Sequence, residues 1–511
     1  MPANAKPLVS RLRAGTAFAC LSLGGLALGA QSAAAQTIRT AEAQPAPVTD
    51  AQRQRMEQQL QELLTMRTEF DKRIGALEVE LHGTSAPPSA IAAAGAPPVQ
   101  TIPAQQAEAT PPKKWGGFEP GKGLVLMRSD NGEVDMGLVS YLRYLNQGGL
   151  KDTYTNAFGK TSNIQQRQDF QLAKVQIVFR GWLFDPRFNY NAYVWTSQAS
   201  QGLGAQVVVA GNLAWTFNDA LKVYFGIQSL PSTRSTNRTF PYWLRNDNRP
   251  IADEFFRGSY TQGIWAEGKI VRGLDYRVMV ANNLSALGVS ALQLDNKLNT
   301  VSGALTWKPT TGEFGPADGF GDFEDHQKVA TLLGAHYTRS TETPQSQPNT
   351  ESIENTQLRL SDGTLLFAND AFNTPGRITE ARYQMVALDA AAKYEGFSLE
   401  FEYYMRWLDR FKTVGVVPVD NLFDTGFQLQ ASAMLVPKTL QFYLSGSKIF
   451  GQYGNPYDIA GGFNWFPFQR RDFRVNAMGL YVYKSPVGYT AYPVPVGGNG
   501  FTFLTDLSLA F

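Results

Sequence analysis

The chain has 511 residues, of which 12% are aromatic, a formal net charge of +2 and a mean hydropathy of −0.24. Its length exceeds what one compact core usually holds, and its near-neutral charge gives no reason to expect nucleic acid as a partner. The hydropathy argues against a helical membrane protein, and the single cysteine, Cys20, excludes a disulfide framework and a thiolate metal site.

The first 35 residues match an export signal. Arg11 and Arg13 supply a positive region, residues 14–30 an apolar stretch and residues 33–35 a small-residue cleavage site. We therefore expect a signal peptide over 1–35. The alternative is an N-terminal helix of the mature protein.

Residues 36–82 carry a helical pattern, and residues 83–117 are rich in Pro and Ala. Apolar residues recur at alternating spacings of four and three, which predicts a coiled-coil helix. Its seam consists of Met56, Leu60, Leu63, Phe70, Ile74, Leu77 and Leu81, with Arg67 as the one polar member. Such a seam favours self-association, although a lone helix that docks on the same chain is the alternative. The Pro/Ala-rich stretch predicts a semi-extended linker.

From residue 118 to 511 the chain consists of short alternating runs separated by Gly, Asn, Asp and Pro. In 397–407 the odd positions are apolar and the even ones mostly charged or polar, and residues 173–179, 221–227, 427–435 and 501–511 repeat this alternation. A strand with one apolar and one polar face suits a barrel in lipid with a wet lumen, and about eleven tilted residues can cross a membrane. A soluble sandwich is the alternative.

The predicted fold class is all-β, a transmembrane antiparallel up-and-down β-barrel of about 16 strands, preceded by the coiled-coil helix. Residues 501–511 should pair with an early strand and close the barrel. Long connections are expected on one rim and short turns on the other; the long ones are 148–166, 229–260, 283–298, 311–326, 340–380 and 484–499. The Gln/Asn/Ser/Thr/Pro-rich residues 341–375 should form an exposed loop.

The stretch 229–260 holds the candidate pore residues, which are Arg234, Arg238, Arg245, Arg249 and Arg257. If this loop folds into the lumen, its guanidinium groups would line the narrowest part and favour anions. Wall residues on the polar faces could extend the path, namely Lys174, Arg180, Lys222 and Arg406. The alternative is that the loop arginines pair with Asp247, Asp253 and Glu254 and hold the loop in place. Because residues 118–511 carry 35 basic and 35 acidic residues, any anion preference must come from local placement.

Catalysis is not supported by the sequence. The chain has three histidines, no nucleophile-elbow pattern and no cluster with metal-ligand spacing. We predict no enzymatic activity, no catalytic residues, no metal and no cofactor.

Four stretches resemble the phosphate-selective porin O and P family. Residues 462–467, Gly-Phe-Asn-Trp-Phe-Pro, and the return strand 473–483 are similar to its penultimate hairpin, and residues 397–403, 223–231 and 257–268 to further family strands. The resemblance implies a homotrimeric sixteen-stranded channel in the outer membrane of a Gram-negative bacterium, with inward loops that set the selectivity. One departure is Ser229, where the family commonly has Lys.

The resulting expectation is an outer-membrane porin for passive diffusion of small solutes, anions such as phosphate among them. Its partners would be outer-membrane lipid, small anionic solutes and further copies of itself, but no nucleic acid, with the N-terminal extension in the periplasm. One alternative is a general or nutrient-specific porin for uncharged solutes with an aromatic track of Trp243, Tyr224, Tyr242 and Tyr404. Another is an envelope tether that acts through residues 48–82.

Overall fold

The computed structural model describes residues 116–119, 121–197, 206–285, 297–347, 357–488 and 492–511, together with Gln61, Thr65 and Lys72, which are helical. The predicted signal peptide lies outside the described residues. The predicted coiled coil and linker also lie outside them, except for these single positions and residues 116–117. The chain divides into two compact units, residues 1–106 and 107–511. None of the helices in the described part is long and apolar enough to span a membrane.

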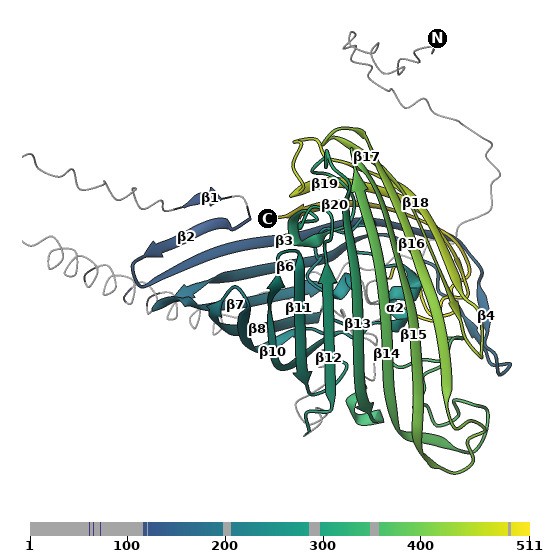
Figure 1. Cartoon of the computed structure of the whole chain (residues 1–511). Coiled ribbons are helices and arrows are strands. Elements are labelled where there is room, and N and C mark those ends of the chain that lie inside the picture. Colours follow the sequence, from purple (N-terminus) through teal and green to yellow (C-terminus); the bar gives the residue numbers. More distant parts are fainter. Residues whose placement is uncertain are drawn as a thin grey trace, which may run out of the picture. The chain divides into compact units, whose positions relative to one another are not determined.

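The second unit is built on one antiparallel sheet of eighteen strands, and sixteen of them close into a barrel (Figure 1). The first eight barrel strands are β3 (Gly132–Leu150), β6 (Gln168–Leu183), β7 (Asp185–Ser197), β8 (Gln206–Asn218), β9 (Leu221–Ser229), β10 (Tyr260–Val271), β11 (Leu274–Ala281) and β12 (Thr300–Trp307). The second eight are β13 (Ala330–Glu342), β14 (Arg377–Tyr394), β15 (Phe397–Val414), β16 (Leu422–Val436), β17 (Leu440–Phe450), β18 (Tyr457–Trp465), β19 (Phe473–Tyr483) and β20 (Gly500–Ala510). Each barrel strand pairs with the next along the chain, so the predicted up-and-down topology of about sixteen strands is confirmed.

The last strand closes the ring as its alternation predicts. β20 pairs with β3, with Leu507 opposite Leu142. Phe501 and Phe503 point outward and are 50% and 40% exposed, whereas Asp506 faces the lumen and is fully buried. The same alternation of exposed apolar and buried polar residues continues around the wall, which gives the barrel an apolar outside and a polar inside.

Two short pairs of strands accompany this wall, and only the first belongs to its sheet. The hairpin of β1 (Gly117–Glu119) and β2 (Gly123–Ser129) extends the sheet beside the beginning of β3. In the loop after β3, β4 (Thr153–Thr155) pairs with β5 (Thr161–Asn163). The hairpin reaches the rim where β20 ends, since the rings of Phe118 and Phe511 are 5.5 Å apart.

One long loop lies on the rim of the barrel where most connections are short turns, although the sequence led us to expect it on the opposite rim. Most connections on this rim are tight; at Glu395 and Gly396 both φ angles are positive (45° and 81°), the conformation of a two-residue hairpin turn. Residues 308–329, however, also join their strands on this rim, so long loops are not confined to one end. The physical reason is that buried Phe314, Phe320 and Phe323 draw this loop into the barrel.

The loop after β13 is also more buried than predicted. We expected residues 341–375 to form an exposed loop, but Leu358, Leu360, Leu366 and Phe372 are all buried. These apolar side chains are spread among the polar ones, so the composition of the stretch concealed them. The described part of this loop therefore packs against the barrel core.

Candidate functional site: the inward loops and the lumenal cavity

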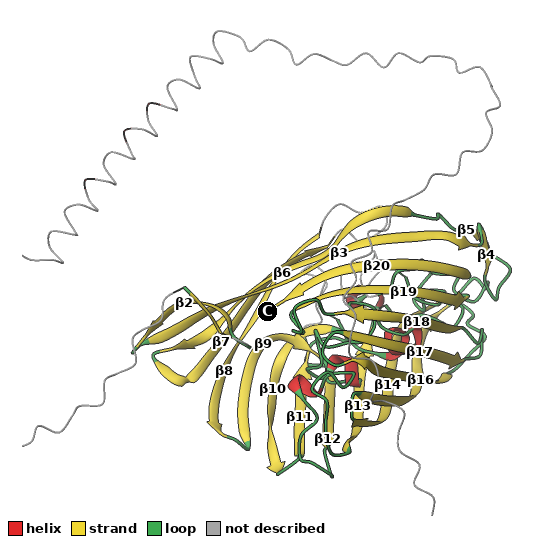
Figure 2. Ribbon diagram, turned by 90° about the horizontal axis from the view of Figure 1, so that it is seen from above, coloured by secondary structure: helices red, strands yellow, loops and turns green. Residues whose placement is uncertain are grey.

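Residues 230–259, here called the inward loop, connect β9 to β10 and fold into the lumen. Viewed from above, loops and short helices lie inside the ring of strands (Figure 2). Almost all residues of the inward loop are buried, and only five retain substantial exposure, namely Asn237, Arg238, Phe240, Pro241 and Tyr242. The sequence left open whether this loop folds inward. The structure places it inside the barrel, and its buried apolar residues include Leu230, Trp243, Leu244 and Phe256.

A short helix, α2 (Ile251–Phe256), fixes the inward loop against β15 to β18. Pro250 precedes the helix, and Asp253 and Glu254 lie in its first turn, where acidic side chains suit the helix dipole. The Phe256 ring stacks on Tyr404 with 5.1 Å between centroids. The Ala252 N–H donates to Ser447 Oγ at 3.1 Å. The Tyr383 hydroxyl also donates to the Phe256 carbonyl, so apolar stacking and hydrogen bonds to the backbone together hold the helix on the wall.

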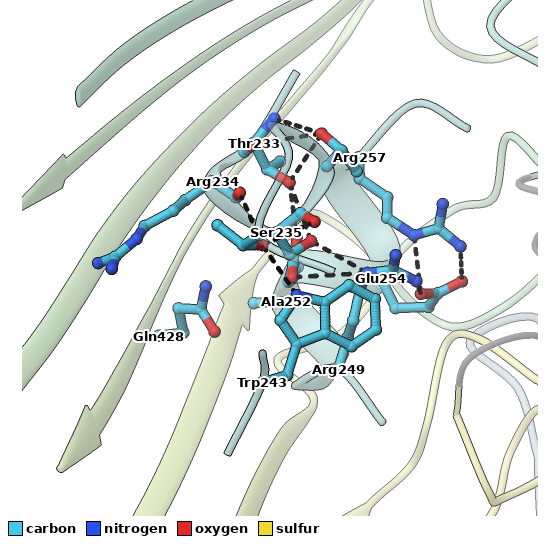
Figure 3. A network of polar contacts seen from close by, with 12 residues as sticks. Thr233, Arg234, Ser235, Trp243, Arg249, Ala252, Glu254, Arg257 and Gln428 are labelled. Carbon is cyan, nitrogen blue, oxygen red and sulfur yellow. Dashed lines mark hydrogen bonds and ion pairs between the residues drawn. The ribbon is translucent and has the colours of Figure 1, made fainter. Parts of the chain in front are cut away.

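Four of the five predicted loop arginines are buried and paired with carboxylates. Arg234 contacts Glu400 of β15, and Arg245 contacts Asp458 of β18 at 2.8 Å. Arg249 and Arg257 both contact Glu254 within the loop, at 3.5 and 2.7 Å (Figure 3). Burial raises the pKa of the nearby Asp253 carboxyl, an effect that Arg249 opposes. These four guanidinium groups therefore anchor the loop to itself and to the wall.

The fifth loop arginine, Arg238, is about half exposed and pairs with Glu267 of β10. Glu267 also accepts from Arg277 at 2.8 Å and from the Tyr224 hydroxyl. Burial alone would lower the pKa of Arg238, but Glu267 outweighs it and raises the pKa. Arg238 is thus the loop arginine with the most access to water.

The predicted wall cations fall into two groups. Lys174 contacts Asp247 of the inward loop at 2.9 Å, and Arg406 contacts Asp424 at 2.7 Å. Arg180 and Lys222 line an open cavity instead. The Arg180 Nη2 donates to the Lys122 carbonyl at 3.0 Å, and the Lys222 ammonium lies 5.0 Å from the Tyr224 ring centre.

Residues 308–329, here called the second inward loop, meet the first one inside the barrel. The Phe320 N–H donates to the Tyr242 carbonyl at 2.8 Å, and the Gly321 N–H donates to Glu400 Oε1 at 3.0 Å. The Arg234 guanidinium lies 4.5 Å from the centre of the Phe320 ring. Sequence reasoning missed this contact, although Phe314, Phe320 and Phe323 within a Gly- and Asp-rich loop were a usable signal.

A buried trio of possible metal ligands, which sequence spacing did not reveal, lies beneath the inward loop. His336, Asp389 and Glu402 come from three neighbouring strands, and their ligand atoms lie within 4.8 Å of one another. The His336 ring nitrogens face the Pro231 carbonyl at 3.0 Å and Asp389 at 2.9 Å. Glu402 accepts the Arg234 N–H at 2.9 Å. Asp389 Oδ2 has no partner among the described residues, but groups of the inward loop occupy one His336 nitrogen and one Glu402 oxygen. A metal would have to displace these loop groups, so the trio fits an anchor for the loop better than a metal centre.

An open cavity of about 1030 Å³, here called the lumenal cavity, lies between the β3 and β6 to β9 wall and the exposed part of the inward loop. Its basic lining residues are Lys122, Arg180, Lys222, Arg470 and Arg471, and its acidic ones are Glu133, Asp135 and Asp472. Aromatic and amide side chains make up much of the remainder. A second space of about 390 Å³ lies beside the second inward loop and shares Lys222 with the first.

Comparisons with known proteins find solved structures with a similar fold, but no related sequence. No protein-family model matches the chain, and no curated protein sequence matches it, so the resemblance to the phosphate-selective family stays a prediction. Similar solved structures include OmpT of Vibrio cholerae (11% identity, 75% of this chain and 99% of that one, TM-score 0.44). An anion-selective porin from Comamonas acidovorans is another (11% identity, 74% of this chain and 100% of that one, TM-score 0.44). The outer-membrane channel DcaP of Acinetobacter baumannii is a third (8% identity, 76% of this chain, 100% of that one, TM-score 0.44). Nothing about solutes follows from similarity at this level.

Proposed function

We propose that this protein is an outer-membrane porin, a non-enzymatic barrel through which small hydrophilic solutes diffuse passively. The observation that carries the proposal is the two-sided wall of the closed barrel. Outward residues such as Phe225 and Leu444, 67% and 54% exposed, can be covered by lipid, while the inward side holds charged and amide groups. A water-filled lumen narrowed by an inward loop is the architecture of a diffusion pore.

The most direct test is electrical. Purified protein in a planar lipid bilayer should give stepwise increases in conductance in KCl, and liposomes that contain it should swell in small isosmotic solutes. Protein that stays monodisperse without detergent, or that inserts without conductance, contradicts the proposal. A variant with charged residues in place of the exposed apolar ones is a poor control because it would not insert.

We further propose a homotrimer, which rests on the family resemblance alone. Unheated gel electrophoresis and mass measurement in detergent should show a species about three times the monomer mass. If the protein is a monomer in detergent and still conducts in a bilayer, the trimer is wrong and the pore function stands.

A weak preference for anions is a second candidate property. The lumenal cavity has five basic and three acidic lining residues, and Arg180 and Lys222 contribute to that excess. The loop arginines contribute less than expected, because wall and loop carboxylates neutralise them. The reversal potential in a KCl gradient tests this preference. A shift toward the equilibrium potential of chloride that becomes smaller in Lys222→Gln supports it. A shift toward the equilibrium potential of potassium contradicts it.

A further inference from the structure

Four polar side chains stand in a row across the wall of the lumenal cavity. In the sheet register Asp135 of β3 is opposite Arg180 of β6, Arg180 is opposite Asn191 of β7, and Asn191 is opposite Asn212 of β8. All four line the cavity. Because neighbouring strands lie about 4.8 Å apart, the row spans roughly 15 Å. We call these residues the polar row.

Three atoms of the polar row lack a protein partner. Within the part of the chain that the structure describes, Asp135 Oδ1, Arg180 Nε and Asn191 Oδ1 are buried and make no hydrogen bond, while the Asp135 carboxyl group as a whole has that of Glu133 as its neighbour. Asp135 as a residue is only 4% exposed. Buried polar atoms are nearly always hydrogen-bonded, so each exception calls for an explanation. Three exceptions on adjacent strands, all beside one cavity, indicate a place where a solute supplies the missing partners.

The order of the unpaired atoms indicates the chemistry of that solute. They alternate as acceptor, donor and acceptor, and the opposite charges of Asp135 and Arg180 make the row formally neutral. A small anion is opposed here by Asp135 and its neighbour Glu133, and a small cation by Arg180. A hydroxyl group both donates and accepts, so a solute with hydroxyls on neighbouring carbons can satisfy all three atoms without burying a net charge.

Aromatic side chains flank the polar row on the same wall. Trp182, Tyr190 and Tyr224 line the cavity with it. Deeper along β7, Trp195 is 3% exposed, and its Nε1 donor has no partner among the described residues. Aromatic faces offer apolar contact to the C–H side of a ring whose edge carries hydroxyls, the combination by which mixed pockets orient a polar ligand.

We propose that the polar row is a binding site for an uncharged, polyhydroxylated ring of monosaccharide size, held by Asp135, Arg180 and Asn191 against the flanking aromatic rings. This inference rests on the proposed pore function, because the site lies on the wall of the diffusion path. It adds a solute class to that function.

The test is block of the ion current by a sugar. The full-length protein in a planar bilayer in KCl should show a saturable, concentration-dependent reduction of current by D-glucose. Asp135→Asn and Arg180→Gln should each raise the half-blocking concentration about tenfold or more, as expected for loss of a hydrogen bond to a charged group. The matched controls are Asp472→Asn and Arg470→Gln, which remove the same charges from the same cavity outside the row and should leave the block unchanged.

Several results would overturn the inference. A conducting wild-type channel that glucose does not block removes the sugar site while the porin function stands. Block by L-serine in place of glucose, sensitive to the same two variants, assigns the row to a zwitterion instead. If the row variants and the control variants raise the half-blocking concentration equally, the effect comes from the overall charge of the cavity and not from a site at the polar row. If the wild type does not conduct at all, the porin function fails as well.

Folding of the variants can be separated from binding. Asp135→Asn preserves the shape of the side chain, and a heat-modifiable shift on gels confirms a closed barrel. Asn191→Ser offers a second route, because it removes the third unpaired atom without changing any charge. Weaker block by glucose in this variant, at unchanged conductance, supports the site; unchanged block contradicts it.

Discussion

The Arg245 guanidinium lies 2.8 Å from the Asp458 carboxylate, and neither side chain is more than 1% exposed. The pair joins the inward loop to β18, more than two hundred residues further along the chain. Removal of one partner from a buried ion pair leaves an uncompensated charge in a place that water does not reach. The pair is therefore one of the contacts that hold the inward loop on the wall.

We expect Arg245→Met to lower the free energy of unfolding by about 3–5 kcal/mol, because Asp458 is left buried without a counter-charge, with only the Ser447 and Tyr492 hydroxyl groups as partners. Denaturant unfolding of protein folded into lipid vesicles measures this. The double variant Arg245→Met with Asp458→Leu removes both charges and should recover most of the loss. If the double variant is as unstable as the single one, packing and not charge explains the effect.

Arg234→Met should loosen the junction between the two inward loops. Arg234 pairs with Glu400 and lies over Phe320 of the second inward loop. Loss of these contacts should increase the current noise of the open state in single-channel recordings, while the barrel stays closed on gels. Arg238→Met is the matched control, since that side chain is half exposed and should leave the noise near the wild-type level.

The second inward loop should respond to alkaline pH through Lys308. Burial would lower the pKa of its ammonium, but Asp318 and Asp275 outweigh burial and raise the pKa above its usual value. A lysine whose folded-state pKa is raised contributes stability below its unfolded-state pKa, and this stability is lost as the pH rises through the folded-state value.

Hydrogen exchange of residues 308–329 should therefore be slow at pH 9 and speed up once the pH passes about 10.4, the usual lysine value. In Lys308→Met the pH dependence from this group should disappear. Exchange that rises equally with pH in both proteins, after correction for the intrinsic rate, would rule out Lys308 as the cause.

The outward face can be tested by a charge placed at mid-strand. Leu429 is 45% exposed at the centre of β16. If lipid covers it, Leu429→Arg should cost about 2–4 kcal/mol of stability in lipid vesicles, the penalty for arginine near the bilayer midplane. Phe468 lies in a turn and is 66% exposed, so Phe468→Arg should cost about 0–1 kcal/mol. Equal costs at the two sites would contradict a membrane around β16.

The sequence predicted the wall well because alternation is a local signal. Residues 397–407 and 501–511 show which side chains face outward, and the structure places both stretches in barrel strands with that orientation. The turn at Glu395 and Gly396 has two adjacent positive φ angles, a conformation that favours glycine at the second position. Strand number followed from length and spacing.

The lumen was harder to predict because its contacts are not local. The five arginines of the inward loop were visible, but the partners of Arg234 and Arg245 lie on β15 and β18. Glu400 could be placed on the lumenal side from its strand pattern, yet no pattern in one sequence states which arginine it meets. The polar row was invisible for the same reason: Asp135 and Arg180 become neighbours only through the register of β3 and β6.

The wall contacts of the inward loop also set an order of assembly. Glu400, Ser447 and Asp458, which hold the loop, all belong to strands made long after it. Until these strands join the sheet, Arg234, Ala252 and Arg245 lack their partners on the wall, and contacts between distant parts of a chain form late. A folding intermediate in which β18 has not joined the sheet would therefore hold the inward loop less firmly than the finished barrel does.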